Sequence, residues 1–221
     1  MYYSMSVWGG EWTCGIGIAT ADRPEGPFTD HGKLFRSNEI NVQNSIDPFY
    51  IEDNGKKYLL WGSFRGIYGT ELSEDGLSLK KDAPIQKIAG TAYEGTYIHK
   101  KDGYYYFFAS IGSCCEGLKS TYTTVVGRSK SLFGPYVDKK GRTMLDNKHE
   151  ILIQANKAFV GAGHNSELIT DKNGADWMFY HAVSVARPEG RVLMLDRVQW
   201  RNGWPYVENS TPSLKSKTPQ M

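Results

Sequence analysis

A strand-turn-strand unit recurs along the chain, and this recurrence limits the possible folds more than any single motif does. Three times, a segment rich in aromatic or β-branched residues is followed by a Gly-containing turn of the kind that closes β-hairpins, and then by a second such segment. The first segments are residues 47–52, 94–99 and 164–169, and the second are residues 58–64, 104–110 and 177–181. Repeats of this kind predict a fold built from successive similar sheets.

A third element repeats more closely than the hairpins do. Residues 15–20 lead to the turn Gly26-Pro27-Phe28, and residues 125–129 lead to the turn Gly134-Pro135-Tyr136. An inner strand, a hairpin, a second strand and an outer strand together make the blade of a β-propeller. A β-sandwich also contains many short strands, but its architecture gives no reason for one signature to recur at this spacing.

The sequence therefore predicts an all-β fold of about four propeller blades. Segments with the apolar period of a helix are scarce. The first aromatic strand, residues 2–6, has no partner strand before it. We therefore expect the N-terminal blade to be absent and residues 1–221 to form one propeller domain.

Charge and hydropathy exclude several classes of partner. The net charge is +2 and charged residues are 23% of the chain, so no strong field of one sign is available for nucleic acid or a membrane surface. No run approaches the roughly 18 apolar residues of a membrane span, and the first residues lack a signal-peptide pattern. Localisation therefore stays open.

The cysteines are too few to define a framework. Cys14, Cys114 and Cys115 fit neither a set of disulfides nor a four-ligand zinc site. The adjacent pair could close a vicinal disulfide, but we expect two reduced, half-buried thiols.

Hairpin geometry predicts which residues share one end of a sheet, because the second strand returns to the end that the first strand left. Asp47 is expected to lie near residues 63–64, Glu94 near residues 113–115, and His164 near His181. If the first strand of each blade lines a central channel, then Asp47, Glu94 and His164 converge at one mouth.

Two carboxylates and an imidazole in a cavity rimmed by Trp8, Phe64 and Tyr93 are typical of a site that cleaves glycosidic bonds. Each residue also has an ordinary structural reading: Asp-Pro often opens a turn, Glu-Gly can close a loop, and a His beside Asn can make structural hydrogen bonds. Their shared position at the head of equivalent strands in three repeats is what favours a site.

Taken together, these sequence segments resemble those of the endo-α-1,5-L-arabinanases of glycoside hydrolase family 43. The resemblance extends from the first residues to about residue 205, and it is specific only as a combination. It rests on residues 44–48 with 58–64, residues 94–97 with 113–115 and 126–129, and residues 161–166 with 176–181. It implies a five-bladed β-propeller that lacks its first blade here, and hydrolysis of α-1,5-arabinofuranosyl linkages in arabinan with inversion.

The resemblance also implies residue roles. Glu94 would be the general acid, and Asp47 would orient that acid and modulate its pKa. His164 would contact an ion, often calcium, that is held through waters. The substrate-binding residues would be Ser63, Phe64, Trp8 and Tyr93. The general base of the family is an Asp near the start of the first blade, and no residue of this chain corresponds to it, so turnover is expected to be low.

Other functions remain open at this point. The absence of a residue that corresponds to the general base agrees with a non-catalytic carbohydrate-binding fragment. Family relatives that act as β-xylosidase or α-arabinofuranosidase are a further alternative, because they share the same sequence segments. A scaffold propeller is a weaker alternative, because the Trp-Asp and Gly-His repeat signatures are absent. Open blade edges predict self-association. Full-length members of the family are expected to be secreted or periplasmic.

Overall fold

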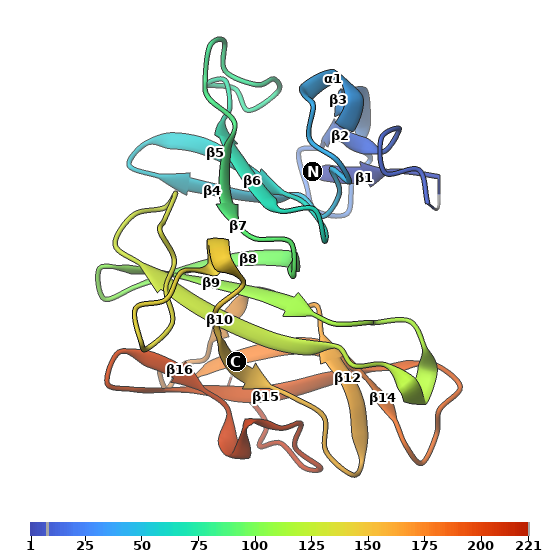
Figure 1. The fold of residues 1–221 in the computed structure, drawn as a ribbon, viewed down its shortest axis with the longest axis vertical. Coiled ribbons are helices and arrows are strands. Elements are labelled where there is room, and N and C mark those ends of the chain that lie inside the picture. The colour runs from blue at the N-terminus through green and yellow to red at the C-terminus, as the bar shows by residue number, and fades with distance from the viewer. Residues whose placement is uncertain (8, 221) are drawn as a thin grey trace. The chain divides into compact units, whose positions relative to one another are not determined.

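The computed structural model describes residues 1–7 and 9–220, and its contacts divide the chain into two compact units, Met1–Thr96 and Tyr97–Met221. Strands dominate both units (Figure 1). The described residues form one short α-helix, α1 at Ser37–Ile40, and three single 3-10 turns. None of these is long and apolar enough to cross a membrane. The predicted all-β class is confirmed, whereas the single domain stays a prediction.

The first unit contains two antiparallel sheets. Three strands form one sheet in the order β1-β2-β3, and four form the other in the order β4-β5-β6-β7. Each strand pairs with its neighbour in the chain, as in a propeller blade. Their bounds are β1 Tyr2–Met5, β2 Gly15–Thr20, β3 Thr29–Arg36, β4 Phe49–Asp53, β5 Lys56–Trp61, β6 Ile67–Glu71 and β7 Gln86–Ala89.

One apolar core joins the two sheets of the first unit. Its buried members come from both sheets and from the segment that links them, namely Ile16, Phe35, Val42, Leu59, Trp61 and Leu72. The rings of Phe35 and Trp61 lie 5.0 Å apart and are tilted by 51°. Because Leu59, Leu60 and Trp61 are all buried, β5 is covered on both faces, which explains why its sequence is a continuous apolar run rather than an alternation.

The predicted hairpin turns have the backbone that their sequences require. Asn54 and Gly55 have φ angles of 51° and 74°, and they connect the paired residues Asp53 and Lys56. Asp102 and Gly103 repeat this geometry with φ angles of 51° and 71°. Two positive φ angles in succession define the turn whose twist matches a β-hairpin, and Asn, Asp and Gly tolerate them best. The sequence therefore identified these two turns correctly.

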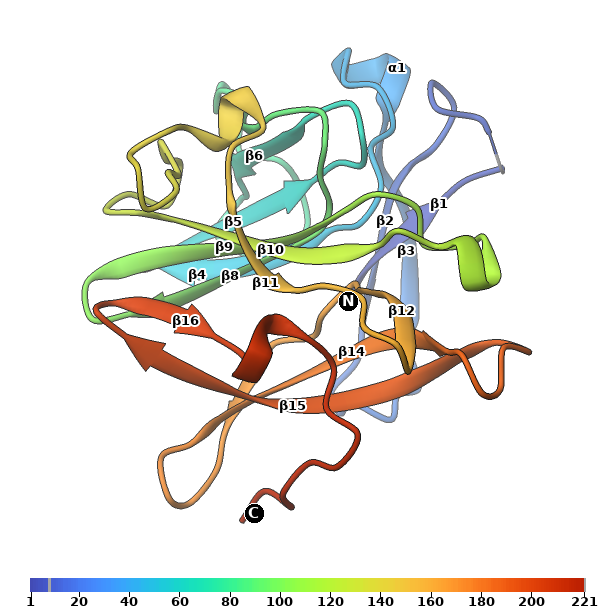
Figure 2. The same cartoon turned by 60° about the horizontal axis from the view of Figure 1, so that its bottom comes forward.

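The second unit is built on one large sheet. The strand order is β16-β15-β14-β12-β10-β9-β8, with β11 beside β10 and β13 beside β14. Figure 2 shows β14, β15 and β16 side by side. The bounds are β8 Glu94–Lys101, which starts in the first unit, β9 Tyr104–Ile111, β10 Thr123–Ser129, β11 Glu150–Ile153, β12 Phe159–Gly163, β13 Leu168–Thr170, β14 Asp176–Ser184, β15 Arg191–Arg201 and β16 Trp204–Tyr206.

The inner strand of the last repeat is interrupted, which corrects the prediction of a continuous strand over residues 164–169. Both β12 and β13 pair with β14, and residues 164–167 between them are not in a strand. The break begins at His164, whose φ is 50°. A left-handed residue cannot continue an extended ladder, so the strand ends at this point.

The two Gly-Pro-aromatic turns are equivalent in conformation. Gly26 and Gly134 have φ angles of 84° and 87°. In each turn, a Cβ added to the glycine would lie 3.1 Å from the backbone nitrogen of the aromatic residue, Phe28 or Tyr136. A side chain at either glycine would be both strained and crowded. The repeat detected in the sequence is therefore a repeat of structure.

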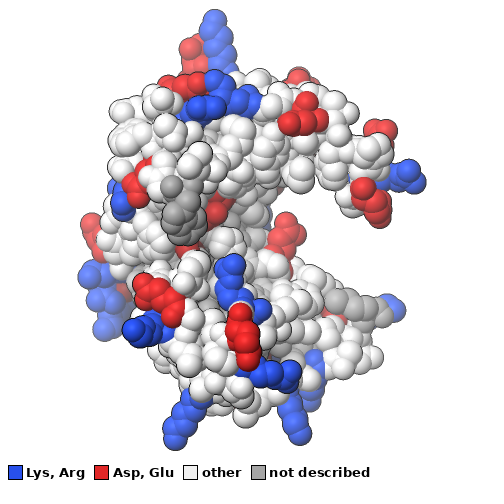
Figure 3. Space-filling view, turned by 90° about the vertical axis from the view of Figure 1, so that its right-hand side faces the viewer, with Lys and Arg blue, Asp and Glu red and all other residues white. Residues whose placement is uncertain are grey.

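Charged side chains are mixed over the surface. On the face drawn in Figure 3, Lys and Arg alternate with Asp and Glu, and neither sign dominates. This distribution agrees with the net charge of +2.

Candidate active site

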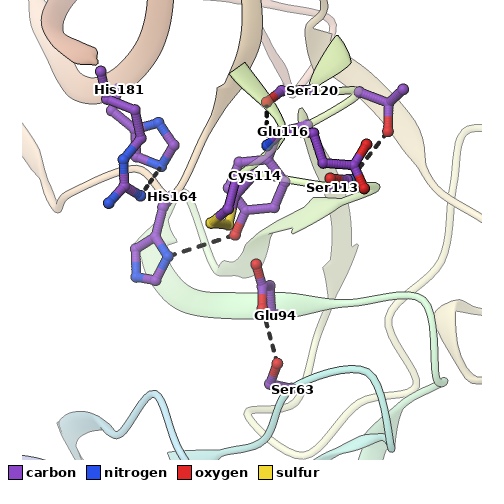
Figure 4. Close-up of a disulfide and its surroundings, with 12 residues drawn as sticks. Ser63, Glu94, Ser113, Cys114, Glu116, Ser120, His164 and His181 are labelled. Atoms are coloured by element: carbon purple, nitrogen blue, oxygen red, sulfur yellow. Dashed lines mark hydrogen bonds between the residues drawn. A yellow bond between two sulfur atoms is a disulfide. The ribbon is translucent and has the colours of Figure 1, made fainter. Parts of the chain in front are cut away.

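Two carboxylates lie at one end of the second sheet of the first unit. Asp47 precedes β4 by two residues, and Glu94 is the first residue of β8. The Oδ2 atom of Asp47 accepts a hydrogen bond from the backbone N–H of Gly95 at 3.2 Å. The Ser63 hydroxyl donates to the Oε2 atom of Glu94 at 2.8 Å (Figure 4). Asp47 therefore contacts the backbone of the residue that follows the proposed acid.

A tight turn before β4 sets the position of Asp47. Asn44 and Asp47 both adopt φ angles of 55°, a left-handed conformation that Asn and Asp tolerate better than most residues do. The Asn44 side-chain amide donates to the Ser63 carbonyl at 2.8 Å, and the Gly62 N–H donates to the Ile46 carbonyl at 2.8 Å. The turn is thereby tied to the segment that carries Ser63.

The predicted substrate-binding residues differ in how much surface they expose. Ser63 is 2% exposed and Tyr93 is fully buried, so neither side chain offers much surface to a ligand. This argues against the predicted contact of Tyr93 with substrate, and it gives the Ser63 hydroxyl the role of a partner to Glu94. Phe64 is only partly buried. Trp8 lies outside the described residues.

Phe64 has an unusual backbone conformation. Its φ is 51°, which is a genuine outlier for a bulky side chain. Its N–H donates to the Tyr93 carbonyl at 2.9 Å, which connects it to the residue before Glu94. Conformations of this kind persist only where the surroundings enforce them, and they concentrate at functional sites.

His164 belongs to the second unit, so its predicted convergence with the two carboxylates stays a prediction. It is exposed, and its backbone N–H donates to the Ser110 hydroxyl at 2.7 Å. Its Nδ1 atom lies 3.5 Å from the Tyr122 hydroxyl (Figure 4). The rings of His164 and His181 are 6.4 Å apart, so the predicted proximity of these two histidines is confirmed.

Close packing fixes the residues beneath His164. The Tyr122 ring is fully buried and stacks on His181 with 5.6 Å between the ring centres. A Cβ added to Gly163 would lie 2.3 Å from the Tyr122 ring, so only glycine fits at this position. Burial, followed by the charge of Arg191, lowers the pKa of His181 from 6.5 to about 4, which keeps its imidazole neutral near pH 7.

The described residues contain no group of side chains that could hold a metal ion by themselves. Nowhere in residues 1–7 and 9–220 do three His, Cys, Asp or Glu side chains come together as a candidate metal site. Calcium takes six to eight oxygen ligands, whereas His164 offers one nitrogen. An ion here would have to be held mainly by water, as the resemblance implies.

The prediction that Cys114 and Cys115 are reduced is wrong, because they form a disulfide (Figure 4). They lie in a loop that is closed at its base: the Ser113 carbonyl accepts the N–H groups of Thr121 and Tyr122, each at 3.0 Å. Two adjacent cysteines are compatible with either the reduced or the paired state, so the sequence alone did not decide between them.

A cavity lies in the second unit. Its volume is about 620 Å³, and it is lined by β15 and residues 207–217, with Asn156 and Trp177. Of the predicted site residues that the structure describes, none borders this cavity.

Sequence reasoning missed the groups that hold the carboxylates. The Gly95 N–H and the Asn44 amide are the main examples, together with the Ser4 hydroxyl, which accepts the Asp47 N–H at 3.0 Å. In the sequence, only Asn44 signalled the turn that positions Asp47, because Asn is enriched at positions with a left-handed backbone.

Comparison with known proteins agrees with the family resemblance of the sequence. The chain matches glycosyl hydrolases family 43 over residues 1–205. It is 35% identical to the extracellular exo-α-(1→5)-L-arabinofuranosidase ArbA of Cellvibrio japonicus, with 94% of this chain and 66% of the relative covered. It is also 35% identical to the extracellular endo-α-(1→5)-L-arabinanase 1 of Bacillus subtilis, with 93% and 64% covered.

Solved structures agree as well. The α-L-arabinanase of Cellvibrio cellulosa complexed with arabinohexaose has a TM-score of 0.85 and 34% identity, with 95% of this chain and 73% of that chain covered. The predicted propeller fold class is thereby confirmed. The chain spans slightly less than two thirds of the length of the two curated relatives. Because the family match takes in residues 1–205, the chain belongs to glycosyl hydrolases family 43.

Proposed function

We propose that this chain is the catalytic part of a glycosidase that hydrolyses α-1,5-arabinofuranosyl linkages in arabinan or arabino-oligosaccharides. The observation that carries the proposal is the pair of contacts from the Asp47 carboxylate to the Gly95 N–H and from the Ser63 hydroxyl to the Glu94 carboxylate. Relatives named for arabinan-degrading activities support the substrate class.

In this proposal, Glu94 is the general acid. A protonated carboxyl is required to donate to the leaving-group oxygen as the glycosidic bond breaks. The Ser63 hydroxyl fixes the rotamer of Glu94, and Asp47 positions the start of β8 through the Gly95 N–H.

The reaction proceeds with inversion in this proposal. An inverting enzyme needs a base that activates water on the opposite face of the sugar, with the two carboxyl groups roughly 6.5 to 9.5 Å apart. We assign this base to no residue of the chain. Calcium held through waters near His164 is also part of the proposal, and metal analysis before and after treatment with EDTA tests it.

The test is a reducing-sugar assay on linear arabinan, with the anomer of the first product followed by proton NMR. We expect release of reducing ends by the purified chain and loss of that release in Glu94→Gln. Glu52→Gln is the matched control, because Glu52 is an exposed glutamate on β4 of the same unit. Equal activity of the Glu94→Gln variant and the control would refute the assignment of the acid.

Carbohydrate binding without hydrolysis is the second candidate. A structural relative that is solved in complex with arabinohexaose supports binding of such a sugar. Calorimetry with arabino-oligosaccharides, run beside the assay, separates binding from turnover. The relatives carry both exo and endo names, so we leave the mode of attack open. Self-association stays a prediction that light scattering would test.

A further inference from the structure

We propose that Glu11 and Arg65 form a positioning clamp that holds Phe64 in the conformation that presents its ring to a sugar. Neither residue is predicted to touch substrate. The role of Phe64 as a sugar contact rests on the proposed function, whereas the effect of the clamp on its backbone does not.

The Arg65 guanidinium joins two partners. Its Nε and Nη2 atoms donate to the two carboxylate oxygens of Glu11 at 2.9 and 2.8 Å. Its Nη1 atom donates to the Phe64 carbonyl at 2.9 Å. A planar fork paired at both oxygens fixes the orientation of the guanidinium, so the third bond holds the Phe64 carbonyl in one direction.

Glu11 is itself fixed from two sides. The Gln43 side-chain amide donates to the Oε2 atom of Glu11 at 2.5 Å. The Asn44 backbone N–H donates to the backbone carbonyl of Glu11 at 2.7 Å. Asn44 in turn bonds the Ser63 carbonyl through its side chain. The clamp therefore connects the loop before β2, the turn before β4 and the segment after β5.

Phe64 needs such support because of its backbone. With a φ of 51°, it occupies a region that is disfavoured by roughly 5- to 30-fold for an unrestrained residue with a side chain. Its N–H is held by the Tyr93 carbonyl at 2.9 Å, and its carbonyl is held by Arg65. The backbone N–H and the carbonyl of Phe64, which flank its Cα atom, are thus both hydrogen-bonded.

The pair is poorly placed to act as a simple stabiliser. The Arg65 and Glu11 side chains are 43% and 31% exposed, and ion pairs with this exposure contribute little to stability. The Lys80–Glu71 pair in the same unit, at 2.6 Å with exposures of 48% and 20%, is a matched control.

The first experiment needs no ligand. Backbone ¹³C chemical shifts and amide hydrogen exchange of Phe64 are measured in the wild type, Arg65→Ala, Glu11→Ala and Lys80→Ala. We expect altered Phe64 shifts and at least severalfold faster exchange of its amide in the first two variants, and no change in Lys80→Ala. Arg65→Lys should behave like Arg65→Ala, because an ammonium group cannot form the fork. Unchanged Phe64 signals in Arg65→Ala and Glu11→Ala would overturn the proposal.

The second experiment measures arabino-oligosaccharide affinity by calorimetry. In the background that keeps Phe64, Arg65→Ala should weaken sugar binding by roughly 3- to 10-fold, because only a fraction of molecules would then present the Phe64 ring to the sugar. In a Phe64→Ala background the same substitution should have no further effect. An equal loss in both backgrounds would overturn the positioning role. If the wild type does not bind the sugar, the proposed function fails, while the ligand-free experiment still decides on the clamp.

Discussion

Replacing Ser63 by alanine would test the link between the sheet and the proposed acid. Ser63 is 2% exposed, and its hydroxyl donates to the Oε2 atom of Glu94 at 2.8 Å. The substitution removes one oxygen and leaves the backbone contacts of the residue intact. Its carbonyl, which accepts the Asn44 amide, is unaffected.

The size of the effect follows from this bond. As Glu94 gives up its proton in the transition state, its carboxyl becomes a charged acceptor, and a hydrogen bond to such an acceptor contributes roughly 1.5 to 3 kcal/mol when it is sheltered. Glu94 is only partly buried, so water can replace part of the lost bond, and about 1 kcal/mol is expected. A loss of 1.4 kcal/mol in the transition state is about a tenfold loss in rate. We therefore expect Ser63→Ala to lower kcat on arabinan by about 5-fold, with KM nearly unchanged.

The assay is steady-state hydrolysis of linear arabinan, combined with thermal unfolding. Ser73→Ala is the matched control, because Ser73 is a half-buried serine of the same unit whose hydroxyl donates to the Asp75 carboxylate at 2.6 Å. The control should keep wild-type kcat. If Ser63→Ala also keeps it, or loses activity only in proportion to unfolded protein, then Ser63 does not position Glu94.

Three further changes have defined outcomes. Asp47→Asn should lower the hydrolysis rate at an unchanged melting temperature, because the Gly95 N–H keeps an oxygen acceptor while the charge is lost; a large fall in melting temperature would contradict this. Gly163→Ala should cost roughly 1 to 3 kcal/mol in urea unfolding, because its Cβ would lie 2.3 Å from the Tyr122 ring; a cost near zero would be a refutation. The pKa of His181 is lowered by burial to about 4, so the unfolded chain takes up the proton first and stability should fall as the pH drops from about 6.5 to 4. Allowing for its partial exposure, this loss is roughly 1 to 2 kcal/mol, and it should shrink in His181→Asn.

Local chemistry made much of the fold predictable. Asn54-Gly55 and Asp102-Gly103 adopt the two positive φ angles of a hairpin turn, and Asn, Asp and Gly favour such angles for steric reasons. The buried run at residues 59–61 marks a strand covered on both faces. These signals are local, so one sequence is enough to detect them.

The contacts that hold the site residues in place could not be predicted in the same way. Phe64 adopts a φ of 51° against the preference of its side chain. Its N–H is held by the Tyr93 carbonyl, and its carbonyl is held by Arg65, which Glu11 orients. Tyr93 was expected at the rim, but tertiary packing buries it. Each of these features is set by segments distant in the chain, which hydrophobic pattern and spacing do not report.

Hydrolysis by Glu94→Gln, compared on two substrates, is the most direct test of the account. An amide cannot protonate a departing sugar oxygen, but an activated aryl leaving group needs no proton. We therefore predict that Glu94→Gln loses activity on linear arabinan and keeps a large part of its activity on an aryl α-L-arabinofuranoside. Equal activity of the wild type and Glu94→Gln on arabinan would contradict the central claim that this carboxyl is the acid of the site.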